Sequence, residues 1–121
     1  MPRFMLLFHD DQCQTEALSP ESRQALFTDF VDWADSLSKR GLYVGSEALA
    51  ANRAAKTVRR RGETLAIEGP FAESQEAVNG YITVRAPDVE AATALAGECP
   101  SLRFGWAVEV RELQEIEKPP H

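Results

Sequence analysis

Four charged residues in the middle of the chain have the types and the spacing that acid–base chemistry uses. They are Glu47, Arg59, Glu68 and Glu73. An arginine keeps a neighbouring carboxylate ionised, whereas a second carboxylate nearby raises the pKa of the first and suits it to transfer a proton. Three carboxylates around one arginine leave surplus negative charge for such tuning. The alternative is a structural network of ion pairs that orders the loop after residue 68.

His9 is a second candidate for proton transfer, since it is the only histidine outside the C-terminal tail. Imidazole is the side chain whose ordinary pKa lies nearest to neutrality, so His9 is the best single base if it faces a cleft. Asp10 follows directly, but neighbours in a strand point to opposite faces, and the two side chains need not touch. The alternative is an exposed histidine in a polar loop.

Two aromatic residues, Phe71 and Tyr81, are candidates for contact with a ligand. The ring of Phe71 either forms an apolar wall for a flat compound or pins the preceding Gly-Pro turn to the core. One histidine with scattered acids is a weak pattern for a metal site, so we expect neither a metal nor another cofactor. Cys13 has no evident activating partner, and we expect both cysteines to be reduced thiols.

The length, net charge and apolar runs of the chain narrow the classes of function that it can have. The 121 residues are enough for one domain, which we place at residues 1–113, with a polar C-terminal tail at 114–121. The net charge of −6 is opposite to that of most nucleic-acid-binding proteins, so we expect no nucleic-acid partner. The apolar run at residues 4–8 is too short for a membrane span or a signal peptide. We therefore expect a cytoplasmic protein with no membrane partner.

The elements that must position these side chains follow from periodicity and from turn residues. Ser19, Pro20 and Glu21 begin a helix that carries an apolar stripe and ends before Gly41. Asp88 caps a second helix, which ends at Pro100. Alternation and turn signals predict strands at residues 3–8, 42–49, 57–61, 64–68, 80–85 and 106–111.

This order predicts an α+β fold of the ferredoxin-like βαββαβ type with an added β-hairpin at 57–68. Two helices cover one face of such a sheet, yet the first strand is apolar on both faces, with Met5 and Leu7 opposite Phe4 and Leu6. A second copy of the sheet is the simplest cover for the other face, so we expect a homodimer. The hydroxyls of residues 81 and 83 would leave that face partly polar, which suits an enclosed wet cleft.

Several motifs also carry a resemblance to a known family. They are Gly45–Leu49, Lys56–Arg59, Glu68–Glu76 with its Gly-Pro-Phe-Ala-Glu run, and Gly80–Tyr81. With these motifs, nearly the whole chain resembles the DGPF-domain branch of the YCII-related proteins. The resemblance implies bacterial origin and a dimeric α/β barrel, in which two ferredoxin-like sheets stack face to face. It also implies a frequent link to alternative sigma factors and, in a few relatives, lyase-like chemistry on small ring compounds through a His–Asp pair.

The chain departs from the family pattern in three places. Glu68 replaces the first aspartate of the signature, Gln75 replaces a lysine, and the first predicted helix, residues 21–38, lacks the histidine of the family's enzymes. The catalytic His–Asp pair is therefore not carried over to this chain.

We expect a homodimeric domain with one small-molecule cleft per protomer, ringed by Glu47, Arg59, Glu68 and Glu73. The cleft would bind a small organic compound or perform acid–base chemistry on it. If the protein is an enzyme, the reaction is of the lyase or isomerase kind, with His9 or one of the glutamates as the base. The alternative is a regulatory or interaction module without catalysis, linked to sigma-factor signalling. That alternative predicts an exposed apolar patch and no ligand-sized pocket.

Overall fold

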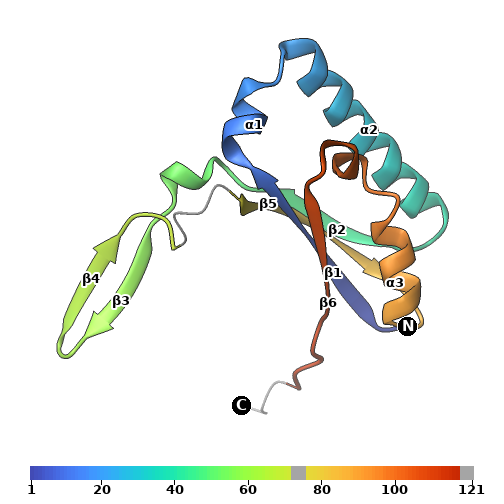
Figure 1. The fold of residues 1–121 in the computed structure, drawn as a ribbon. Helices are drawn as coiled ribbons and strands as arrows, with labels where there is room; N and C mark the ends of the chain where they lie inside the picture. Colours follow the sequence, from blue (N-terminus) through green and yellow to red (C-terminus); the bar gives the residue numbers. More distant parts are fainter. Residues whose placement is uncertain (72–75, 118–121) are drawn as a thin grey trace.

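The computed structural model describes residues 1–71 and 76–117 of the chain (Figure 1). Its six strands are β1 (Arg3–Asp11), β2 (Tyr43–Ala48), β3 (Thr57–Arg61), β4 (Thr64–Glu68), β5 (Glu76–Arg85) and β6 (Ala107–Glu112). Its helices are α1 (Gln12–Ala17), α2 (Pro20–Lys39) and α3 (Val89–Ala96), with short 3-10 turns η1 (Asn52–Ala54) and η2 (Pro100–Phe104).

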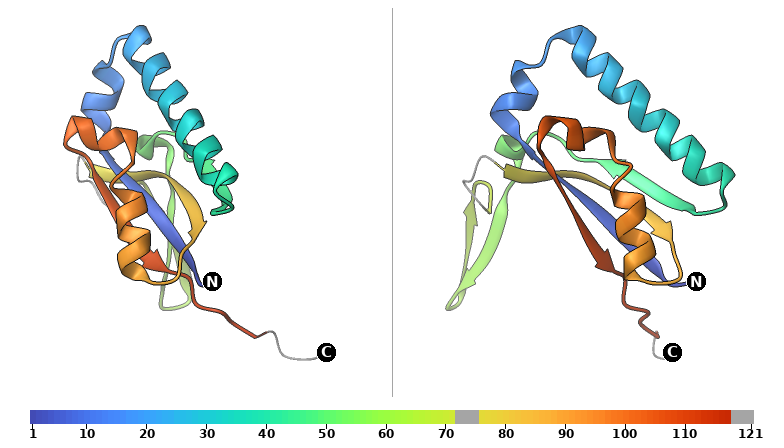
Figure 2. Two further views of the ribbon diagram at one scale, coloured as in Figure 1. Left: turned by 90° about the vertical axis from the view of Figure 1, so that its right-hand side faces the viewer. Right: turned by 45° about the vertical axis from the view of Figure 1, so that its right-hand side comes forward.

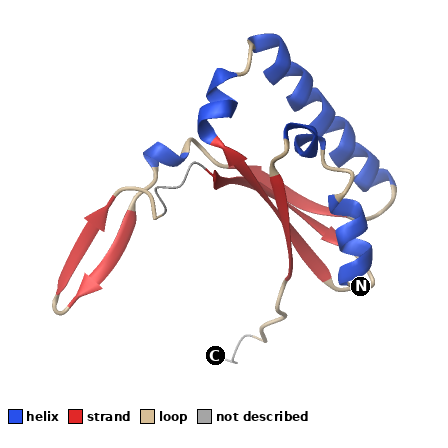
Figure 3. Ribbon diagram, viewed as in Figure 1, coloured by secondary structure: helices blue, strands red, loops and turns tan. Residues whose placement is uncertain are grey.

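Four strands form one antiparallel sheet in the order β2-β5-β1-β6, and β3 pairs with β4 in a separate hairpin. Helices α2 and α3 lie on one side of the sheet, and the hairpin extends from its end on the other side (Figures 2 and 3). The α+β ferredoxin-like fold with an added hairpin, predicted from the sequence, is confirmed. We call the helix-covered side of the sheet the closed face and the other side the open face.

The core fills the space between the closed face and the two helices. Phe4 and Leu6 of β1 are completely buried there, and they pack with Trp33 and Leu37 of α2. Helix α2 begins where the sequence predicts, because the hydroxyl of Ser19 accepts a hydrogen bond from the first helical turn. In the part of the chain that the structure describes, no helix is long and apolar enough to cross a membrane.

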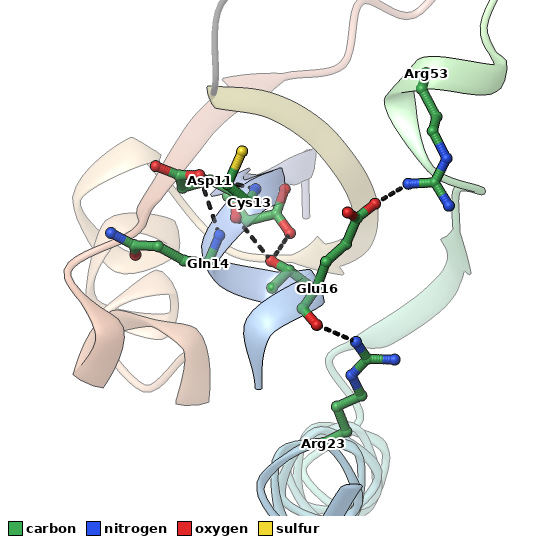
Figure 4. Close-up of polar contacts among 8 residues, drawn as sticks. Asp11, Cys13, Gln14, Glu16, Arg23 and Arg53 are labelled. Atoms are coloured by element: carbon green, nitrogen blue, oxygen red, sulfur yellow. Dashed lines mark hydrogen bonds and ion pairs between the residues drawn. The ribbon is translucent and has the colours of Figure 1, made fainter. Parts of the chain in front are cut away.

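The start of the chain differs from the prediction, because β1 runs to Asp11 and residues 12–17, for which the sequence predicts no element, form helix α1. The carboxylate of Asp11 caps this helix by accepting hydrogen bonds from the backbone of Cys13 (2.9 Å) and Gln14 (3.2 Å) (Figure 4). The hydroxyl of Thr15 donates to the buried carboxylate of Asp10 at 2.5 Å. Cys13 belongs to this short helix, and its side chain is exposed.

A polar contact joins α2 to the end of α3 at the edge of the core. The guanidinium of Arg40 donates to both carboxylate oxygens of Glu98, at 2.9 and 3.2 Å. The indole Nε1 of Trp33 donates to the same carboxylate at 3.2 Å. The Arg40 hydrogen bond is the main cause that holds the pKa of Glu98 below its ordinary value, so the carboxylate stays ionised.

We expect the substitution Glu98→Gln to lower the free energy of unfolding by about 1 kcal/mol at pH 7, a small value because the ion pair is partly exposed to solvent. The pKa of Glu98 is lower in the folded state than in the unfolded state. The contribution is therefore complete above the unfolded pKa, about 4.3, and is lost as the pH falls through the folded pKa.

Urea denaturation of the wild type and of the Glu98→Gln variant at pH 7 and pH 3 measures this difference. The gap between the two proteins should shrink at pH 3, and the exposed residue Glu117, changed to glutamine, serves as the control. A gap that is equally large at both pH values would contradict the assignment of the stabilisation to the ionised carboxylate.

Candidate functional site

The open face of the sheet brings three of the residues predicted from sequence onto one surface. Directly paired residues in a sheet share a face, and the pairing places Glu47 beside Tyr81, Tyr81 beside Leu7, and Leu7 beside Glu109. His9 lies two residues further along β1 and shares this face with Leu7. The open face therefore carries His9, Glu47 and Tyr81 across three neighbouring strands.

His9 has a carboxylate partner that the sequence reasoning missed. Its ring Nε2 lies 3.1 Å from Oε1 of Glu109, which comes from β6, and both side chains are partly exposed. A carboxylate in this position fixes the orientation and the tautomer of the ring. Asp10 lies on the opposite face, in keeping with the expectation that it need not touch His9. Alternation along β6 is the sequence signal that places Glu109 on the open face.

The remaining described candidates, Arg59, Glu68 and Phe71, lie together at the hairpin. Glu68 accepts a hydrogen bond from Arg61 at 2.7 Å, and Nε of Arg59 lies 3.9 Å from its other carboxylate oxygen. The guanidinium of Arg59 also lies 5.1 Å from the centre of the Phe71 ring. The hydrogen bond from Arg61 is the largest of the effects that lower the pKa of Glu68.

The predicted constellation of four charged residues is thus divided between two places. Glu47 belongs to the four-stranded sheet, whereas Arg59 and Glu68 belong to the separate hairpin. Glu73, the fourth member, lies outside the described residues. An ionised Glu68 held by two arginines has the form of the structural ion network that the sequence left as the alternative.

A pocket of about 300 Å³ lies between α2 and the β2–β5 edge of the sheet. Its apolar wall is formed by Phe8, Phe27, Phe30, Val31, Ala34 and Ile82. Its sheet side is formed by Ser46, Glu47, Ala48, Asn79, Gly80 and Tyr81. The strand pairing directs Ser46 and Ile82 to the closed face, whereas it directs the side chains of Glu47 and Tyr81 to the open face.

Aromatic rings give this pocket its shape. The rings of Phe8 and Phe30 meet at a centroid distance of 5.2 Å with their planes tilted by 59°, an edge-to-face type of contact. Phe27 is 64% exposed although it is a large apolar residue, and it lies on the pocket wall together with Val31. Ser46 and Asn79 are polar residues of the lining, and Oγ of Ser46 lies 2.6 Å from the hydroxyl of the neighbouring Tyr43. The pocket therefore offers an apolar, ring-sized space with a hydroxyl pair beside it.

Potential metal ligands are scattered over the described residues, and the two cysteines differ in exposure. No group of three or more histidine, cysteine, aspartate or glutamate side chains within residues 1–71 and 76–117 is arranged to hold a metal ion. Cys99 is buried, and its burial raises the pKa of the thiol, so this residue is a poor nucleophile.

We expect Gly80→Ala to destabilise the protein by about 1–3 kcal/mol, because a Cβ atom at this position would lie 2.8 Å from the backbone oxygen of Glu47. The clash would push β2 away from β5 and deform the pocket. Thermal unfolding measures the effect, and Gly69→Ala is the matched control, since a Cβ atom there meets open space. Equal melting temperatures for the two variants would contradict this reading of the close approach.

Comparison with known proteins agrees with the fold and with the motifs. The model of the YCII-related domain matches residues 3–117, which is nearly the whole chain. No curated protein matches the sequence. Since the family model covers far more than half of the chain, the protein belongs to the YCII-related family.

Proposed function

We propose that this domain binds a small organic compound in the pocket between α2 and the β2–β5 edge of the sheet. The observation that carries this proposal is the pocket itself, a space of about 300 Å³ with three phenylalanine rings on its wall. That volume lies at the lower end of the range for small-molecule sites, which are mostly apolar with a few polar groups. The pocket therefore suits a compound of about one ring.

The lining indicates the chemistry of such a compound. Aromatic walls favour a flat, apolar body, and the paired hydroxyls of Ser46 and Tyr43 can donate to or accept from one polar substituent. A phenol or a small aromatic heterocycle has both properties. The ligand class that we propose is thus a single aromatic ring with one polar group.

Binding accounts for this pocket better than acid–base catalysis does. A general base must come within hydrogen-bond reach of the proton that it removes. Among the residues that line the pocket, Glu47 is the carboxylate, and its strand position directs the side chain to the open face. His9, the other candidate base, also lies on the open face with Glu109. Lyase or isomerase chemistry would therefore need the open face as its site.

We also propose that the functional unit is a homodimer in which two open faces stack. Met5 and Leu7 of the central strand β1 lie on this face and are only half-buried in one chain, although both are apolar. Thr83 and Tyr81 add hydroxyls beside them. A second copy would remove the apolar side chains from water and leave the polar ones in a cleft between the sheets, with His9 and Glu109 in it.

We expect phenol and indole, used as probes, to shift the amide resonances of residues 46–48 and 80–82 in a titration followed by NMR. The substitution Val31→Trp should weaken binding at least tenfold, because the larger ring occupies the space that the probe needs. Thr28→Trp, an exposed position on the same helix, is the control. Equal binding by both variants, or no shift in the wild type, would overturn the pocket as the ligand site.

For the dimer, light scattering should give twice the monomer mass for the wild type at micromolar concentration. Leu7→Lys should raise the dissociation constant at least a hundredfold, because it places an unpaired charge in the middle of the stacked faces. Ser36→Lys, on an exposed position of α2, should leave the mass unchanged. A concentration of 100 µM is on the order of 10⁵ times a nanomolar dissociation constant. A wild type that stays monomeric up to this concentration would contradict the dimer.

A further inference from the structure

The two faces of the β3–β4 hairpin differ in how many contacts their side chains make. Pairing in the hairpin places Arg59 and Arg61 on one face with Glu68, where the ion pairs and the Phe71 ring engage them. The other face, which we call the aliphatic face, carries Val58 opposite Ile67 and Leu65 opposite Arg60. The charged side chains of one face are therefore engaged by close contacts, whereas the other face presents three aliphatic side chains beside one arginine.

The aliphatic face is open to solvent. Val58 is 60% exposed, Leu65 is 56% exposed and Ile67 is 71% exposed. A two-stranded hairpin on its own is at best marginally stable in water, and each aliphatic side chain left exposed forgoes the stabilisation that burial would give. The composition of this face is that of a packed surface, and it indicates a cover from another molecule.

The position of the hairpin shows on which side such a cover would lie. In Figures 1 and 2, the hairpin projects beyond the sheet on the side opposite α2 and α3, which is the side of the open face. The segment before the hairpin is tied to the body by an ion pair between Arg53 of η1 and Glu16 of α1 (Figure 4). Glu16 is in turn held by α2, because Arg23 donates to its backbone oxygen at 2.7 Å. The hairpin thus extends next to the space that a molecule on the open face would occupy.

Charge indicates what the covering molecule is. Residues 56–68 contain four basic and two acidic side chains, whereas the rest of the chain contains nine basic and seventeen acidic ones. Two basic hairpins repel each other, as do two acidic bodies, whereas a basic hairpin attracts an acidic body. The body of a second copy of this chain has the charge that complements the hairpin.

We propose that the hairpin is a docking arm that clasps the second protomer of the dimer. The three aliphatic side chains pack on the body of the partner copy, and Arg60 on the same face meets its acidic surface. The two arms are exchanged symmetrically, as a two-fold interface requires. This inference rests on the proposed homodimer, and it assigns to the hairpin a surface that the stacking of the open faces alone does not use.

The first test compares two variants that add the same charge to opposite faces of the arm. Ile67→Asp lies on the aliphatic face and Thr64→Asp on the other, so a general effect of charge is common to both. In analytical ultracentrifugation, Ile67→Asp should raise the dissociation constant of the dimer at least tenfold above that of Thr64→Asp. Both variants should keep the melting temperature of the body, measured on dilute monomer, because the hairpin forms its own separate sheet.

Equal dissociation constants for Ile67→Asp, Thr64→Asp and the wild type would overturn the clasp while the dimer itself survived. A wild type that remains monomeric would overturn the dimer and the clasp together, and would show that the occupant is not a second copy. The Ile67→Asp variant therefore tests the clasp, whereas the Leu7→Lys variant tests the stacking of the open faces.

Cross-linking of mixed isotopes identifies the occupant directly. Equal amounts of ¹⁴N-labelled and ¹⁵N-labelled chain are unfolded together in urea and refolded, so that mixed dimers form. A carbodiimide then couples the amine of Lys56 to nearby carboxylates. We expect peptides in which Lys56 of one isotope is joined to an acidic residue of the other isotope. Links from Lys56 that join only chains of the same isotope would show that the arm packs on its own body and would overturn the proposal.

Discussion

The fold depends on the central strand β1 being apolar on both faces while the helices cover only one of them. Phe4 and Leu6 anchor the core beneath α2 and α3, and the sheet is assembled around them. Met5 and Leu7 alternate with these residues and are directed to the side that has no helix. This constraint links sequence, fold and assembly, because the polar residues His9, Glu47 and Tyr81 share the uncovered side with an apolar strip that needs a partner.

Local signals in the sequence predict most of the elements. The bounds of the hairpin follow from alternation and from Gly62, whose φ of +64° suits glycine, and the start of α2 follows from the serine cap. Helix α1 is missed because residues 12–17 have no apolar periodicity. Its contacts include the cap at Asp11, the hydrogen bond from Thr15 to Asp10, and a hydrogen bond that Gln14 accepts from the indole of Trp106. Such contacts depend on where β1 ends, which a periodic pattern does not specify.

The candidate site was harder to predict than the fold, for two physical reasons. Spacing along the chain places Glu47, Arg59 and Glu68 near one another, but the hairpin leaves the sheet and takes Arg59 and Glu68 with it. The pocket depends on how α2 packs against β2 and β5, and a helical stripe gives the buried side of a helix but not its tilt. Phe27 reads as part of the core stripe in the sequence, yet it lies exposed on the pocket wall.

The hairpin joins two strands, β2 and β5, that are hydrogen-bonded neighbours in the main sheet. Residues added to or removed from the hairpin in cross-strand pairs would therefore leave the register of the four-stranded sheet unchanged. Its contacts are local in sequence, so it can open and close as an independent cooperative unit while the core stays folded. The protein thus combines a body whose geometry is tightly constrained with an appendage whose length and surface can change in evolution at little cost to folding.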